Sequence, residues 1–341
     1  MTQRRGPGGC QRRARGAPIA SVLIASAALV ACRARPPREA SGRFGPTDAA
    51  PIYHVLRDYD RRWRDQVEDG VELARAFWGS YGPVHVWIAG RESDDAPTDA
   101  AAAAFLAEYR QWRATRGEVD EAEVQRHAKA RFLDVVHRGD AEAYLSWIEA
   151  PAPPTAELVF LNVHEWFFAA DAIPDPVLRG VHEYTHVFQM AFADTPTWMT
   201  EGGAVFAEAW IPWVAGRCDA AFVSTRMEHS MRSARRALDA GYSIADMEDI
   251  DAAPPAIRRF YRELAYDAGA WATAYLVHAS PTRSVAAMRD EFYPMVREVG
   301  WERALCQYTG VADKSAFYAD VAAFLAQPAR VRRQVLETLQ P

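Results

Sequence analysis

The first regular pattern along the chain is a series of apolar residues at helical spacing. Between Ile52 and Ser80 they return every three or four residues, which predicts a helix that ends at the turn-forming segment 79–83. The next five residues, 84–88, alternate in polarity and are rich in β-branched side chains, so they predict a strand. The apolar positions of the expected helix are Val55, Leu56, Tyr59, Trp63, Val67, Val71, Leu73, Ala74 and Phe77.

The middle of the chain is expected to hold further helix and a second strand. Residues 99–148 are rich in Ala, Glu and Arg and predict mostly helix, with interruptions near Gly117 and Gly139. Three prolines at 151–154 mark a break, and the apolar segment 157–163 then predicts a strand. The strand runs directly towards the next helix.

That next helix has a clear start signal. Asp175 is a suitable N-cap, Pro176 suits the first helical position, and no proline follows before Asp194. A second helix is expected over 198–210. After Pro212 the pattern is almost wholly helical, and the expected helices are 219–239, 256–280, 282–299, 301–309 and 314–339. The expected fold class is therefore α+β, mainly α.

The first thirty-one residues have a different character. Five arginines without any acid precede an apolar run over 17–31, which is typical of a secretory signal and too short for a comfortable membrane span. The sequence Leu29-Val30-Ala31-Cys32 resembles a bacterial lipobox, which implies lipidation of Cys32 and a place in the bacterial cell envelope. An ordinary signal peptide or an N-terminal anchor helix is the alternative. Residues 32–51, rich in Pro, Arg, Gly and Ala, are then expected to be a flexible tether.

Charge and cysteine content narrow the class of partner. Removal of 1–31 takes away five arginines, so the formal net charge changes from −6 to −11. An acidic body argues against nucleic acid as a partner. Two cysteines remain in the body, Cys218 and Cys306, and the sequence leaves open whether they form a disulfide or stay free thiols.

The helix that begins near Asp175 carries the pattern His-Glu-x-x-His. His182 and His186 are four residues apart, so both imidazoles lie on one face of the helix and can bind a single metal ion. Glu183 is adjacent to them and can accept a proton from water without being a ligand. A catalytic zinc site needs a third protein ligand, and Glu201, fifteen residues after His186, is the candidate.

The segment around this glutamate carries a resemblance to a known family. Trp198, Glu201, Gly202 and Ala204 match the form Trp-x-x-Glu-Gly-x-Ala, which resembles the second motif of the gluzincin branch of the zincin metallopeptidases. The resemblance covers about residues 158–280. It implies that His182, His186 and Glu201 bind Zn²⁺, that Glu183 is the general base, and that the reaction is peptide-bond hydrolysis. No third histidine follows at the spacing of the metzincin alternative.

Further residues are candidates on weaker grounds. Glu208 lies seven residues after Glu201 on the same helix face, so it could orient a ligand histidine or could be a rim acid. Gluzincins commonly use a tyrosine as an oxyanion donor; the resemblance makes Tyr266 the best match and Tyr261 the reserve, with core packing as the alternative for both.

The resemblance also implies a zincin-like architecture. A small strand-containing N-terminal lobe, 52–196, would hold the His-Glu-x-x-His helix, and a helical C-terminal lobe, 197–341, would hold the third ligand. The strand at 157–163 would be an edge strand that pairs with an extended peptide substrate. No Gly-x-Met-Glu-Asn segment precedes His182, so endopeptidase activity is favoured over aminopeptidase activity. The alternative function is an envelope protein of the zincin fold that binds a peptide or partner without turnover.

Overall fold

The computed structural model describes residues 42–91, 97–118, 120–165 and 173–341. The expected signal segment 1–31 and Cys32 therefore lie outside the described residues. None of the helices in the described ranges combines the length and apolar character that crossing a bilayer requires.

Residues 42–51 belong to the folded body and not to the tether that the sequence predicted. The main-chain amide of Arg43 donates to the carbonyl oxygen of Met190 at 2.7 Å, and the side chain of Phe44 is buried. Strand β1 (Gly45–Pro46) pairs antiparallel with β3 (Tyr81–Gly82). The prediction of a tether is wrong for this segment because one buried aromatic residue and main-chain pairing hold it against the body.

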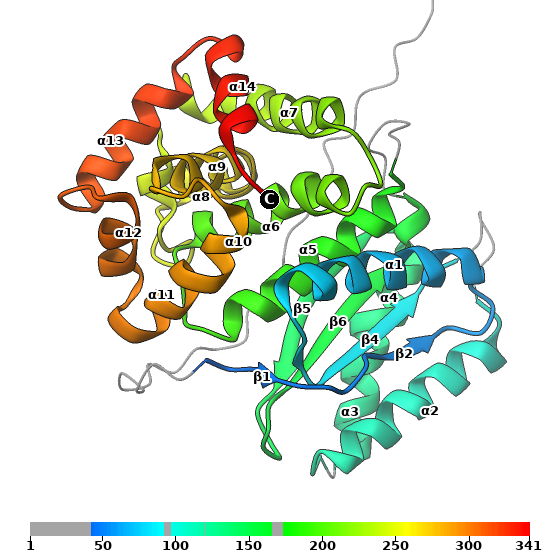
Figure 1. The fold of residues 1–341 in the computed structure, drawn as a ribbon. Coiled ribbons are helices and arrows are strands. Elements are labelled where there is room, and N and C mark those ends of the chain that lie inside the picture. Colours follow the sequence, from blue (N-terminus) through cyan, green and yellow to red (C-terminus); the bar gives the residue numbers. More distant parts are fainter. Residues whose placement is uncertain (1–41, 92–96, 119, 166–172) are drawn as a thin grey trace, which may run out of the picture. The chain divides into compact units, whose positions relative to one another are not determined.

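A four-stranded mixed sheet forms the centre of the N-terminal half (Figure 1). Its strand order is β2 (Ile52–Val55), β4 (Val84–Ala89), β6 (Thr155–Leu161) and β5 (Glu142–Ile148). The first three strands are parallel, and β5 is antiparallel to β6. The strands expected at 84–88 and 157–163 are present as β4 and β6. The prediction that 157–163 is an edge strand is wrong, because β6 pairs on both sides.

Two segments that the sequence predicted as helical are strands. Ile52–Val55 is β2, and the helix that follows, α1 (Arg61–Trp78), begins only after Asp60, whose side chain accepts a hydrogen bond from the amide of Arg62 at 2.8 Å. Glu142–Ile148 is β5, the antiparallel edge of the sheet. Runs this short do not reveal their period, and pairing with β4 or β6 decides their conformation.

Helices cover both faces of the sheet. On one side, Trp87 of β4 packs edge-on against Phe105 and Tyr109 of α2 (Asp99–Thr115). The same side holds α3 (Glu121–Ala128), a π-helical turn (Lys129–Leu133) and α4 (Asp134–Arg138). On the other side α1 packs along α5 (Asp175–Met190). Pro174 occupies the N-cap of α5, so Asp175 is its first residue and not its cap as predicted.

The C-terminal half is helical, as the sequence predicts, and the fold as a whole is α+β and mainly helical. The predicted helix over 314–339 is two helices, because Pro328 separates them, and the predicted helix over 256–280 is divided by a π-helical segment, Arg262–Ala268. Cys218 and Cys306 are free thiols. The helices are α6 (Thr197–Val214), α7 (Ala220–Leu238), α8 (Pro255–Arg258), α9 (Gly269–Ala279), α10 (Val285–Ala287), α11 (Tyr293–Val299), α12 (Trp301–Thr309), α13 (Lys314–Leu325) and α14 (Ala329–Thr338).

Helix α6 is fixed by contacts on two sides. It packs against α5 and crosses α9 closely. At the crossing with α9, a Cβ atom added to Gly202 would lie 2.1 Å from the carbonyl carbon of Gly269. Only glycine permits this distance between the two backbones. The neighbouring residue Glu201 is thereby held at the surface of α5.

Candidate metal centre

Helix α5 presents its two histidines on one face. The ring centroids of His182 and His186 are 4.8 Å apart, and the ring planes are nearly perpendicular at 87°. Both side chains are buried. This arrangement follows from the four-residue spacing, because residues i and i+4 of a helix lie one above the other.

Helix α6 brings a carboxylate to the same point. Oε2 of Glu201 lies 3.5 Å from Nε2 of His182 and 3.4 Å from Nε2 of His186. One donor atom from each of the three residues lies within 4.8 Å of the other two. Oε2 is buried and has no hydrogen-bond partner, whereas Oε1 accepts a hydrogen bond from the hydroxyl of Tyr261 at 2.9 Å. Oε2 of Glu201 therefore lies where the three side chains meet and accepts no hydrogen bond from the protein.

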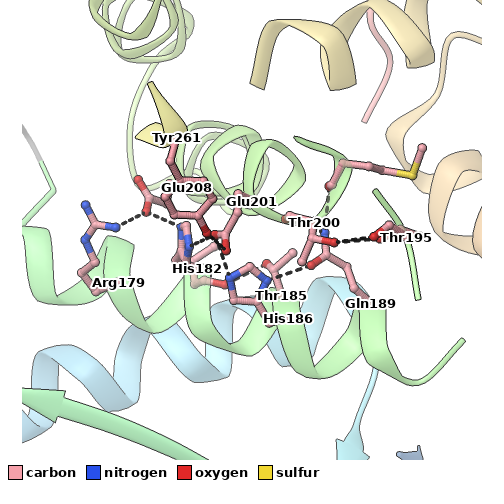
Figure 2. Close-up of polar contacts among 12 residues, drawn as sticks. Arg179, His182, Thr185, His186, Gln189, Thr195, Thr200, Glu201, Glu208 and Tyr261 are labelled. Atoms are coloured by element: carbon pink, nitrogen blue, oxygen red, sulfur yellow. Dashed lines mark hydrogen bonds and ion pairs between the residues drawn. The ribbon is translucent and has the colours of Figure 1, made fainter. Parts of the chain in front are cut away.

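The other ring nitrogen of each histidine has its own partner (Figure 2). Nδ1 of His182 lies 2.8 Å from Oε1 of Glu208, and Nδ1 of His186 lies 2.9 Å from Oε1 of Gln189. A carboxylate and an amide oxygen only accept hydrogen bonds, so each Nδ1 carries the proton that it donates. In the neutral ring this leaves a lone pair on each Nε2, the atom that faces Glu201.

Glu208 is held in place by two arginines. Nη1 of Arg179 lies 3.1 Å from Oε1, and Nη2 of Arg226 donates to Oε2 at 3.1 Å. Burial alone would raise the pKa of this carboxyl, but Arg179, His182 and Arg226 outweigh burial and lower the pKa. Glu208 is therefore ionised and accepts the proton of His182 Nδ1. Glu208 is buried against the ring of His182 and is therefore not an acid exposed at a rim.

Charge in the cluster is arranged for a cation. Burial disfavours the charged imidazole, but the carboxylates of Glu201 and Glu208 outweigh burial and raise the pKa of His182. The pKa of Glu201 is lowered, because the two imidazoles outweigh the effect of its own burial. Two imidazole nitrogens and one carboxylate are the donor set of many catalytic zinc sites. The residues present fit Zn²⁺.

Glu183 follows His182 on α5 and is not one of the three candidate metal ligands. Its side chain is 3% exposed. Burial raises the pKa of the carboxyl, while the nearby His182 and His186 act in the opposite direction. A buried carboxyl with a raised pKa can exchange a proton at a pH closer to neutrality than an exposed one.

Both candidate tyrosines border the site. The ring of Tyr266 stacks on that of His182, with centroids 5.8 Å apart and planes at 12°. The ring of Tyr261 lies edge-on to that of Tyr266 at 5.3 Å, and its hydroxyl donates to Glu201. Burial raises the pKa of both phenols, so both remain protonated donors at neutral pH.

Three residues with contacts in the site were missed from the sequence. Arg179 and Gln189 lie on α5, three residues before His182 and three residues after His186, so helical spacing could have indicated them. Arg226 comes from α7, and no sequence spacing connects it with Glu208.

No known protein family, curated protein or solved structure matches this chain.

Proposed function

We propose that this protein is a zinc-dependent peptide hydrolase of the gluzincin type, with a zincin-like fold. The observation that supports the proposal is the position of Glu201 Oε2, buried without a donor and within 3.5 Å of Nε2 of both His182 and His186. Each Nε2 carries a lone pair in the neutral ring. A buried acceptor that faces two further acceptors is costly unless a proton or a metal cation lies between them.

The donor set favours zinc among the common divalent cations. His182, His186 and Glu201 would hold the ion. Two imidazole donors suit zinc, whereas magnesium and calcium prefer oxygen ligands. When bound, zinc supplies Lewis acidity, which lowers the pKa of water and polarises a substrate carbonyl.

Glu183 has the environment of a general base. Its carboxyl lies on the same helix as the two histidines and is buried, and burial raises its pKa. It would take a proton from the attacking water and return it to the leaving amine. Tyr266, stacked on His182, would donate a hydrogen bond from its phenol to the oxyanion that develops on the substrate. Tyr261 already donates to Glu201, so we assign to it the orientation of this carboxylate.

The substrate in this proposal is a peptide or protein that binds as an extended strand. One edge of the sheet is β5 (Glu142–Ile148), which pairs only with β6; the other edge is β2, which pairs only with β4. An unpaired strand edge binds extended peptides through main-chain hydrogen bonds that do not depend on side chains. We assign to β5 the substrate-binding role that the sequence assigned to 157–163.

The proposed location is the bacterial cell envelope. The basic segment, the apolar run and the lipobox-like sequence that ends at Cys32 support a lipid anchor in the membrane. The acidic net charge of the remaining chain gives no support for a nucleic-acid partner.

Metal analysis and a peptide digest with one isosteric variant test the activity. The purified protein should contain about one zinc per chain and cleave a broad peptide library. Glu183→Gln should keep the zinc and lose hydrolysis, whereas Glu298→Gln, an exposed change on α11, should leave both unchanged. A zinc-loaded wild type that cleaves no peptide would instead favour a zincin-fold protein that binds a peptide or envelope partner without turnover. Wild type without zinc affinity would exclude both functions.

A further inference from the structure

Gln189 connects one proposed zinc ligand with the helical turn that carries another. Its side chain is buried, and Oε1 lies 2.9 Å from Nδ1 of His186. Nε2 donates to the main-chain carbonyl oxygens of Met199 at 3.3 Å and Thr200 at 3.0 Å, in the first turn of α6. Thr200 directly precedes Glu201. The same amide therefore contacts the ring of one ligand and the backbone next to another (Figure 2).

The chemistry of these partners fixes the orientation of the amide. Two main-chain carbonyls only accept hydrogen bonds, so the NH₂ group of Gln189 must face them. The amide oxygen must then face His186, whose Nδ1 has to be the protonated nitrogen. The hydroxyl of Tyr293, 3.3 Å from Nε2, lies beside the same NH₂ group. The resulting lone pair on Nε2 of His186 points towards Glu201 Oε2, 3.4 Å away.

Gly203 provides the space for this amide. A Cβ atom added to Gly203 would lie 2.8 Å from Nε2 of Gln189, closer than real Cβ atoms approach another heavy atom. The next nearest atom, the hydroxyl oxygen of Tyr293, would be 3.6 Å away. An alanine at 203 would therefore displace the amide of Gln189 before anything else.

We infer that Gln189 is a positioning residue of the metal centre, which fixes the tautomer of His186 and holds this ring in register with Glu201. The inference rests on the proposed zinc site. On the other side of the centre, Glu208 fixes the tautomer of His182 with a charged group. Gln189 does so with a neutral group and also binds α6, so it sets the relative position of two ligands from two helices.

Zinc affinity, measured by chelator competition with the full chain, tests this role. Gln189→Met retains the length of the side chain without its polar atoms and should weaken zinc binding by about 10- to 100-fold. Gln189→Glu keeps the acceptor for His186 but places a carboxylate against two carbonyls of α6, so zinc affinity should fall by about threefold, less than in Gln189→Met, while the melting temperature falls. Gln334→Met, an exposed change on α14, is the matched control.

Two further measurements separate positioning from a general loss of structure. In the zinc-loaded protein, the Nδ1 proton of His186 should give a slowly exchanging NMR signal in wild type and in Gln189→Glu but not in Gln189→Met. Gly203→Ala should weaken zinc binding when it is the only change and should add little to the effect of Gln189→Ala in the double variant.

The outcomes of this test and of the functional test are distinct. Wild type that binds no zinc would exclude the proposed function. Wild type that binds zinc, with Gln189→Met binding equally tightly or Gln189→Glu as weakly as Gln189→Met, would leave the function standing and overturn the role of Gln189.

Discussion

Nδ1 of His182 lies 2.8 Å from Oε1 of Glu208, and this carboxylate is bound in turn by Arg179 and Arg226. The histidine that would bind the metal is thus oriented by a charged group that two arginines hold. We predict that Glu208→Gln weakens zinc binding by about 10- to 100-fold, because the amide is a weaker acceptor for Nδ1. Chelator competition measures the change. Affinity equal to that of wild type would show that Glu208 serves only the stability of the fold.

The two tyrosines of the site should respond differently to removal of the hydroxyl. Tyr266→Phe should reduce kcat by about ten- to a thousandfold with zinc retained, if this phenol stabilises the oxyanion. Tyr261→Phe leaves Oε1 of Glu201 without its 2.9 Å donor and should chiefly weaken zinc binding. Steady-state kinetics at saturating zinc distinguishes the two effects. An unchanged kcat in Tyr266→Phe would leave Tyr266 with its stacking contact to His182 alone.

The sequence was most informative where spacing within a helix determines geometry. His182 and His186 are one helical turn apart, and Glu201 follows on the next helix after a short turn, so their convergence could be expected. Glu208 could be indicated by its place on the face of Glu201. Arg226 could not, because it reaches Glu208 from α7, and only the packing of α6 and α7 brings them together.

The elements that were misassigned depend on pairing partners distant in the sequence. Ile52–Val55 is a strand because it pairs with β4, and Glu142–Ile148 is a strand because it pairs with β6. Neither is long enough to show a period of its own. The error over 157–163 has a different cause. Its apolar run is typical of a strand buried on both faces, and such a strand lies inside a sheet rather than at its edge.

The close crossing of α6 and α9 should make Gly202 sensitive to the smallest side chain. A Cβ atom there would lie 2.1 Å from the backbone of Gly269, so Gly202→Ala forces the two helices apart. We expect a loss of at least about 1–3 kcal/mol in the free energy of unfolding, and weaker zinc binding because Glu201 moves with α6. Denaturant titration measures the first effect. Gly45→Ala is the control, since nothing lies within 4 Å of its added Cβ; equal stability of the two variants would contradict the prediction.

A chain of hydrogen bonds on the far side of the sheet predicts acid sensitivity. Nε1 of Trp112 donates to Nε2 of His85 at 3.1 Å, Nδ1 of His85 lies 2.9 Å from Nε2 of His54, and Nδ1 of His54 lies 2.6 Å from Oε1 of Glu108. The indole only donates and a carboxylate only accepts, so every proton in the chain points towards Glu108. A further proton on either imidazole would set two donors against each other.

This arrangement should make the protein less stable as the pH falls. Burial, His54 and Arg116 lower the pKa of His85 from 6.5 to about 3. The unfolded chain therefore binds one more proton than the folded chain between these values, and stability falls with decreasing pH by up to about 1.4 kcal/mol per pH unit. The contribution is complete above pH 6.5 and is lost as the pH falls towards 3.

Comparison with His85→Gln isolates this contribution. Asp267, whose pKa burial raises to about 6, has the opposite effect, since its share of stability is lost as the pH rises from 3.8 to 6. Because Asp267 is present in both proteins, the difference between their stabilities cancels its effect. Glutamine can still accept and donate but does not titrate, so the free energy of unfolding of wild type should fall more steeply than that of the variant between pH 6.5 and 4. Parallel curves over this range would show that His85 has the same pKa in the folded and unfolded states.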